Sequence, residues 1–216
     1  MANKTFFNLE TIAALTAIVV SIAALFIAWD QSQVMRAQQH ASVWPMVDTR
    51  VSIAKDDKAY FLSIDIKNVG VGPALLNQAT FTAQDKPLLT FEQLDEFLLE
   101  SQFEGNRQIH SSSLSGVLGA GEARVVLKVS WPITDKNTEA FRQLASNFMG
   151  DSAVDLDINL CYCSVFDKCW RTQDERSSPS AFVGYCPVQE TDPIETLMGS
   201  LSSSQSELEE GINQGD

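Results

Sequence analysis

The sequence predicts a mainly β protein, in which an N-terminal transmembrane helix precedes an immunoglobulin-like β-sandwich with two short helical insertions and a disordered acidic tail. Three observations predict this class. A charge-free apolar run comes first, segments with alternating apolar and polar side chains follow, and the chain ends in polar, acidic sequence. With 216 residues, 44% of them hydrophobic, the chain has the length for one compact domain beside the helix.

The negative charge is concentrated at the C-terminal end. The formal net charge is −13, and residues 187–216 contain seven acidic residues and no Lys or Arg. No cluster of Lys and Arg exists elsewhere in the chain, so the composition excludes nucleic acid as a partner and excludes polybasic binding to anionic lipid. The low apolar content of residues 187–216 predicts that this tail is disordered.

The apolar run at residues 11–29 predicts a single-pass transmembrane helix, preceded by a ten-residue flank at 1–10. Nineteen residues at about 1.5 Å each match a hydrocarbon core of about 30 Å. A cleaved signal peptide is the first alternative, but the run exceeds a typical signal core and no small-x-small cleavage site follows it. A buried helix of a soluble protein is the second, and the apolar character of every face argues against it.

Small residues on this helix and charges beside it suggest two further properties. Helix association is one option, because Ala13, Ala17, Ser21 and Ala24 recur at intervals of three or four; an unpartnered helix facing lipid is the other. Lys4 and the N-terminal amine favour a cytoplasmic N-terminus, which places the soluble domain outside the cytoplasm.

Helix-forming residues at 30–44 predict a polar helical stalk that ends before Pro45.

The β domain is expected over residues 45–186. Strands are predicted at 46–54, 60–67, 74–83, 109–118, 123–131, 151–163, 170–173 and 181–186. The alternation assigns apolar residues to a core face, among them Tyr60, Leu62, Ile64, Ile66, Val125, Leu127 and Val129.

Two helices interrupt the strands. Residues 90–101 form one, with Thr90 and Gln93 as a capping box, and residues 135–149 form the other, with Gly150 as its stop.

A glycine-rich motif follows the second strand. Asn68, Gly70, Gly72 and Pro73 predict a turn, since glycine and proline favour backbone angles that turns require. A phosphate-binding loop is excluded, because no helix pattern and no Lys-Ser/Thr pair follows the glycines.

The four cysteines are the main candidates for chemistry. Strand phase puts Cys161 and Cys163 on the outer face of strand 151–163, and a loop at 164–168 would set Cys163 opposite Cys169. This arrangement suits two disulfides, Cys163 with Cys169 and Cys161 with Cys186. Four reduced thiols on a cytoplasmic domain, a zinc site formed by all four, and redox catalysis remain alternatives; the spacing lacks the C-x-x-C units of common zinc sites.

Other candidate groups are few. His40 on the stalk and His110 beside Ser111, Ser112 and Ser113 lack the pattern of a catalytic triad. Asp155 and Asp157 would share the outer face of their strand, where solvated carboxylates are commoner than a cation site.

Several motifs resemble those of a group of uncharacterised bacterial single-pass membrane proteins. These motifs are "ASVWP" at residues 41–45, Asn-x-Gly-x-Gly-Pro-Ala at 68–74, and a late hairpin with aromatic residues at Tyr162 and Trp170. The resemblance implies an N-terminal anchor, a β-sandwich and location in the bacterial cytoplasmic membrane. It implies no catalytic residue, because no activity is assigned to the group. The cysteines and the acidic tail depart from the pattern.

We therefore expect a non-catalytic binding module with no cofactor, tethered to the membrane as an accessory subunit or a sensor for a protein partner. The expectation follows from a well-patterned scaffold without a catalytic constellation. A metal- or thiol-dependent enzyme that uses Cys161, Cys163 and Cys169 is the alternative. A third hypothesis assigns the function to helix association by residues 1–40.

Overall fold

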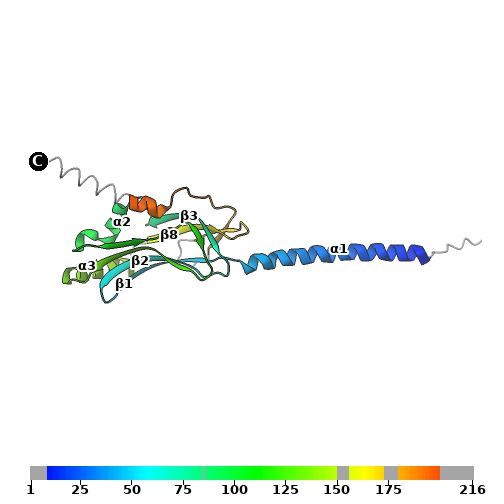
Figure 1. The fold of residues 1–216 in the computed structure, drawn as a ribbon, viewed down its shortest axis with the longest axis horizontal. Helices are drawn as coiled ribbons and strands as arrows, with labels where there is room; N and C mark the ends of the chain where they lie inside the picture. The colour runs from blue at the N-terminus through cyan, green and yellow to red at the C-terminus, as the bar shows by residue number, and fades with distance from the viewer. Residues whose placement is uncertain (1–8, 85, 150–155, 173–179, 200–216) are drawn as a thin grey trace, which may run out of the picture. The chain divides into compact units, whose positions relative to one another are not determined.

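The computed structural model describes residues 9–84, 86–149, 156–172 and 180–199 (Figure 1). The chain divides into two compact units, residues 1–42 and residues 43–216. The first contains the N-terminal helix, and the second contains both β-sheets.

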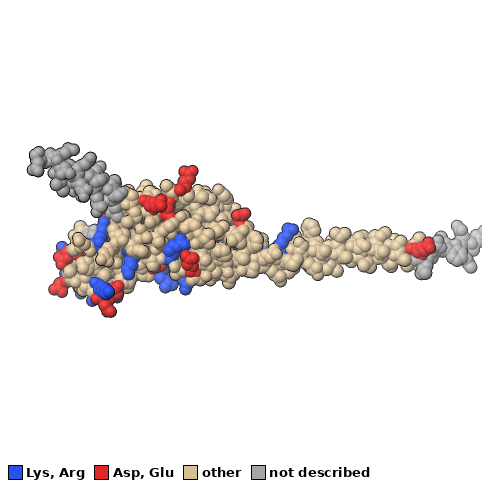
Figure 2. Space-filling view, in the orientation of Figure 1, with Lys and Arg blue, Asp and Glu red and all other residues tan. Residues whose placement is uncertain are grey.

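One continuous helix, α1 (Leu9–Ser42), accounts for the described part of the first unit. The helical segment of residues 10–42 is long and apolar enough to span a membrane. No residue in its most apolar 18-residue window is buried. On the face that Figure 2 shows, α1 carries few charged side chains. The predicted spanning segment and stalk are thus parts of one helix, which ends at Ser42 rather than at residue 44.

The first sheet of the second unit has four antiparallel strands. Their order is β1 (Val47–Lys55), β2 (Ala59–Asn68), β7 (Ala123–Pro132) and β5 (Gln108–Ser111). The turn between β1 and β2 is closed by Asp56, whose carboxylate accepts hydrogen bonds from the backbone N–H groups of Lys58 and Ala59. These two bonds favour the ionised form and lower the pKa of Asp56.

The second sheet has six strands, also paired antiparallel. Its order is β10 (Ala181–Val183), β9 (Cys169–Arg171), β8 (Leu156–Cys163), β3 (Ala74–Ala83) and β4 (Lys86–Pro87), with β6 (Gly116–Leu118) also paired to β3. β8 matches the strand predicted at 151–163 over residues 156–163. Residues 150–155 lie outside the described residues.

Both sheets contribute to one hydrophobic core. Leu62 and Ile64 of β2 belong to the same buried cluster as Phe81 of β3 and Ile158 of β8. The predicted alternation of β2 is confirmed, because Tyr60, Leu62, Ile64 and Ile66 are all buried. The two sheets therefore pack against each other over a single core.

The predicted phase of β7 is wrong at one residue. The register between β2 and β7 shifts after Ile64, which pairs with Leu127, whereas Asp65 pairs with Val125. Val126 is thereby an extra residue, and it is fully buried while Val125 is 37% exposed. A β-bulge of this kind moves the next side chain to the other face of the sheet.

Two α-helices lie between the strands, as predicted. α2 (Phe91–Leu98) begins at Thr90, whose hydroxyl accepts from the Gln93 N–H while the Gln93 side chain accepts from the Thr90 N–H, so the capping box is confirmed. A 3₁₀ turn, η1 (Glu100–Gln102), follows it. α3 (Asp135–Met149) buries Ala140 and Leu144 against the core.

The strand predicted at 109–118 is instead two short strands, β5 and β6, joined by residues 112–115. Asp192 holds this connection: its carboxylate accepts hydrogen bonds from the Ser113 hydroxyl and from the N–H groups of Leu114 and Ser115. A side chain distant in sequence thus replaces the strand pairing that these backbone groups would otherwise make.

Disorder predicted from residue 187 onward is wrong for residues 187–199. Residues 193–199 are helical, and Ile194 and Leu197 are buried in the main core. Asp192 caps this helix by accepting from the Ile194 N–H at 2.9 Å. Residues 200–216 of the predicted tail lie outside the described residues.

Candidate functional site

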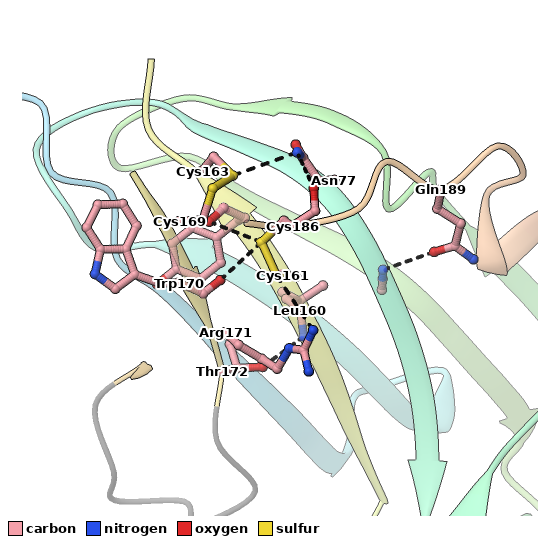
Figure 3. Close-up of a disulfide and its surroundings, with 12 residues drawn as sticks. Asn77, Leu160, Cys161, Cys163, Cys169, Trp170, Arg171, Thr172, Cys186 and Gln189 are labelled. Atoms are coloured by element: carbon pink, nitrogen blue, oxygen red, sulfur yellow. Dashed lines mark hydrogen bonds between the residues drawn. A yellow bond between two sulfur atoms is a disulfide. The ribbon is translucent and has the colours of Figure 1, made fainter. Parts of the chain in front are cut away.

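The four cysteines form one buried cluster, with three of them on the β8–β9 hairpin and Cys186 after β10 (Figure 3). The Sγ atoms of Cys161 and Cys186 lie 1.99 Å apart, and those of Cys163 and Cys169 lie 2.04 Å apart. These are the two disulfide pairs that strand phase favours. The remaining described residues contain no free cysteine.

The hairpin register explains the disulfide between Cys163 and Cys169. β8 and β9 are antiparallel, and Cys163 is directly opposite Cys169. The connecting turn is closed by the Ser164 N–H, which donates to the carbonyl oxygen of Lys168 at 2.7 Å. Side chains directly opposite each other in an antiparallel pair lie close enough for a disulfide.

A second β-bulge directs Asn77 towards the cysteine cluster. The register between β3 and β8 shifts between Leu76 and Gln78, which leaves Asn77 without a partner on β8. The amide nitrogen of its side chain lies 3.7 Å from Cys163 Sγ and donates to the carbonyl oxygen of Cys186 at 3.3 Å (Figure 3). The bulge therefore links β3 to both disulfides.

The chain after β10 covers the cluster. The Gln189 N–H donates to the carbonyl oxygen of Asn77, and the Gln189 side chain accepts from the Ala79 N–H (Figure 3). Cys161 and Cys163 do lie on the face opposite the main core, but they are at most 4% exposed. The predicted outer face is thus confirmed, and a second, smaller core that contains the four cysteines covers it.

Tyr162, between these cysteines in sequence, points into the main core. Its hydroxyl accepts from the Val47 N–H of the opposite sheet at 3.2 Å and donates to Ser180 Oγ at 2.9 Å. Burial raises the pKa of Tyr162, because the phenolate would lose solvation, and the two hydrogen bonds oppose this effect. The residue thus ties the two sheets together beside the disulfides.

Three aromatic side chains form a row beside the hairpin, which we call the aromatic row: Trp44, Trp170 and Phe182. The ring centroids of Trp44 and Trp170 are 6.4 Å apart, and those of Trp170 and Phe182 are 6.2 Å apart. Trp44 is 53% exposed and Phe182 is 67% exposed. Sequence patterns did not reveal this row, since its members come from three segments that only the fold brings together.

The Asn68 motif fixes residues 43–46, which we call the entry segment. Asn68 is fully buried, and its side-chain oxygen accepts from the N–H groups of Met46 and Gly70. Its amide nitrogen donates to the carbonyl oxygens of Gly72 and Leu118. The side chain thereby uses its two donors and two acceptor positions.

Both glycines of the motif lie against the entry segment. A Cβ atom at Gly70 would lie 2.4 Å from the Met46 nitrogen, and one at Gly72 would lie 2.1 Å from the Val43 oxygen. Backbone hydrogen bonds keep the motif against the entry segment, since the Val71 N–H donates to the carbonyl oxygen of Trp44 at 3.0 Å. The motif is therefore a backbone clamp, and Pro73 leads from it into β3.

The histidines and aspartates that the sequence singled out do not gather with the cysteines or the Asn68 motif in the described chain. His110 is exposed on β5, where it pairs with Lys128 of β7. Asp157 accepts a hydrogen bond from Thr49 Oγ1 at 3.3 Å, while Asp155 lies outside the described residues. His40 belongs to α1.

The small residues of α1 lie on an exposed helix. Ala13, Ala17, Ser21 and Ala24 are exposed in the described chain, and the Ser21 hydroxyl donates to the Ala17 carbonyl oxygen. This bond satisfies Ser21 within its own helix.

A family model described as a domain of unknown function, DUF8453, matches residues 11–151. The chain belongs to this family. The matched region contains the apolar part of α1, the entry segment and the Asn68 clamp. The comparison with curated proteins found no match, and neither did the comparison with solved structures. The four cysteines lie C-terminal to the matched region.

Proposed function

We propose that this DUF8453 protein is a single-pass membrane protein whose β domain binds a protein partner without catalysis, as an accessory subunit or a sensor. The observation that carries the proposal is the aromatic row, because Trp44 and Phe182 keep more than half of their surface exposed. Trp and other aromatic residues dominate the energetic centres of protein interfaces. Neighbouring exposed apolar side chains mark interaction surfaces more often than isolated ones do.

The location proposed for the protein is a bacterial cytoplasmic membrane, with α1 as the anchor and the β domain outside the cytoplasm. Two features support it. The apolar window of α1 has the length and hydropathy of a membrane span, and four cysteines lie at disulfide-bonding distance. Disulfides persist in oxidising compartments and are rare in the cytosol.

We further propose that the two sheets form an immunoglobulin-like sandwich and that the chain is a member of the bacterial single-pass group that shares its Asn68 motif. The shared core of the two antiparallel sheets supports the first point. The clamp formed by Asn68, Gly70 and Gly72 supports the second, since it gives the motif a structural role.

The enzymatic alternative at Cys161, Cys163 and Cys169 is supported less well. A catalytic thiol must be reduced and reachable, whereas these three side chains are paired and at most 4% exposed.

Site-specific photocrosslinking in intact cells tests the binding proposal. With a photoreactive phenylalanine analogue in place of Phe182, we expect one discrete crosslinked product, which Trp44→Ala reduces. The same analogue in place of Leu89, which is 61% exposed against 67% for Phe182 but lies outside the aromatic row, is the matched control and is expected to give none. Equal crosslinking at both positions, or none at position 182, would overturn the proposal.

A further inference from the structure

We propose that the four cysteines form a zinc site when their two disulfides are reduced. The Sγ atoms of Cys163, Cys169 and Cys186 all lie within 4.8 Å of one another, although they belong to two different disulfides. Zinc in a tetrahedral thiolate site has Zn–S bonds of about 2.3 Å, which sets the sulfur atoms about 3.8 Å apart. Shifts on the order of 1 Å therefore bring these three sulfurs to ligand positions.

Cys161 supplies the fourth ligand. Its Sγ is bonded to that of Cys186, which is one of the three, although Cys161 itself lies outside the group of sulfurs within 4.8 Å of one another. Reduction lets the sulfurs of each pair move apart, from a bond length to the separation that a metal ion requires. Four thiolates complete the coordination that structural zinc prefers, with no position left for water.

Two side chains can stabilise the thiolates. The amide nitrogen of Asn77 lies 3.7 Å from Cys163 Sγ, and the guanidinium of Arg171 lies 4.0 Å from Cys161 Sγ (Figure 3). Zinc with four thiolates carries a net charge of about −2, which the guanidinium partly offsets. Donors of this kind orient metal ligands and typically change metal affinity by about 10- to 100-fold.

The chemistry requires a reductant, for which a small dithiol suffices. Each dithiol reduces one disulfide by exchange, so two dithiols become two cyclic disulfides and the protein gains four thiols. Zinc then replaces four protons. In the reverse exchange two cyclic disulfides accept the four electrons and become dithiols again, the protein regains its two disulfides, and the ion is released.

The metal would replace the covalent ties between the hairpin and the chain that covers it. In the oxidised protein Cys186 joins the covering segment to β8. In the reduced protein the same link would run through zinc, so the C-terminal helix at 193–199 keeps its attachment in either state.

Metal titration of the full chain in detergent tests the proposal. The chain is reduced with a phosphine, and the phosphine is removed under anaerobic conditions. The reduced chain is then titrated with Co²⁺ or Cd²⁺, whose thiolate charge-transfer bands report sulfur ligands. We expect binding of one ion per reduced chain, displacement of Co²⁺ by Zn²⁺, and no binding by the oxidised chain. A reduced chain without charge-transfer bands, or with an equal response after oxidation, would overturn the proposal.

Variants locate the site. Arg171→Gln should weaken metal binding by about tenfold, whereas Arg142→Gln, on the exposed surface of α3, should leave it unchanged. Cys161→Ser should lower the charge-transfer intensity by one thiolate, with folding checked by circular dichroism. If that variant does not fold, the number of thiols that Zn²⁺ protects from alkylation in the unaltered chain decides: four support the site, and two or fewer contradict it.

Discussion

The side-chain amide of Asn68 donates a hydrogen bond of 2.8 Å to the carbonyl oxygen of Gly72, four residues later in the chain. Through its other bonds the same side chain holds Met46 and Leu118, which belong to two separate segments. One buried residue therefore joins the start of the β domain to the β2–β3 turn and to β6.

Asn68→Ala is expected to lower the free energy of unfolding by about 2–4 kcal/mol, because it leaves buried backbone groups without their partners. Chemical unfolding of the full chain in detergent, followed by tryptophan fluorescence, measures this loss. Asn106→Ala, at an exposed loop position, is the control and should change stability by less than about 0.5 kcal/mol. Equal effects of the two substitutions would contradict the clamp.

Gly72→Ala should also destabilise the domain, by about 2 kcal/mol or more, since the new Cβ would overlap the backbone of Val43. Gly184→Ala provides a matched comparison, as a Cβ there meets no atom within 4 Å. Thermal unfolding should therefore show a lower Tm for the first variant alone. An unchanged Tm for Gly72→Ala would show that the entry segment is not held against the motif.

The two disulfides should differ in their contribution to stability. The closed segments span 25 residues for Cys161 and Cys186 and 6 residues for Cys163 and Cys169. Loop-closure entropy then predicts losses of about 3.5 and about 2 kcal/mol when each pair is replaced by serine. Denaturant unfolding of the two double variants measures the order, and the reverse order would contradict this assignment.

Tyr162 should make stability fall at high pH. Its pKa is raised in the folded state, so its contribution is complete below the ordinary tyrosine value of about 10 and is lost as the pH rises through the folded-state pKa. Tyr162→Phe should flatten this decline and cost about 1 kcal/mol at neutral pH through the lost hydrogen bonds. Tyr185→Phe, at an exposed site, is the control and should change the stability at neutral pH by less than about 0.5 kcal/mol.

Local patterns in the sequence predicted much of the fold. The alternation from Tyr60 to Ile66 gave the correct buried face of β2, and Thr90 with Gln93 marked the start of α2. These features depend on neighbours within a few residues, which is why the sequence alone reveals them.

The bulges at Val126 and Asn77 could not be predicted in this way. Each depends on the register of a partner strand that is distant in sequence. The consequences are large. The first bulge places Val126 rather than Val125 in the core, and the second directs the side-chain amide of Asn77 towards the disulfides.

The C-terminal helix did carry a local signal. Asp192 is an N-cap residue, Pro193 suits the first helical position, and apolar residues follow at Ile194 and Leu197. The acidic composition of residues 187–216 as a whole concealed this short pattern. Cys161 and Cys163 are buried because the chain that follows β10 covers them. This chain leads into the C-terminal helix.

Thiol labelling of intact cells is the most direct test of the central claim, that the β domain lies outside the cytoplasm with its disulfides formed. A membrane-impermeant maleimide is applied before and after an impermeant reductant, and the labelled protein is detected by its mass. We predict no labelling before reduction and labelling of all four cysteines after it. Cysteines that stay unlabelled until the cells are lysed, and then react without reduction, would contradict both the location and the disulfides.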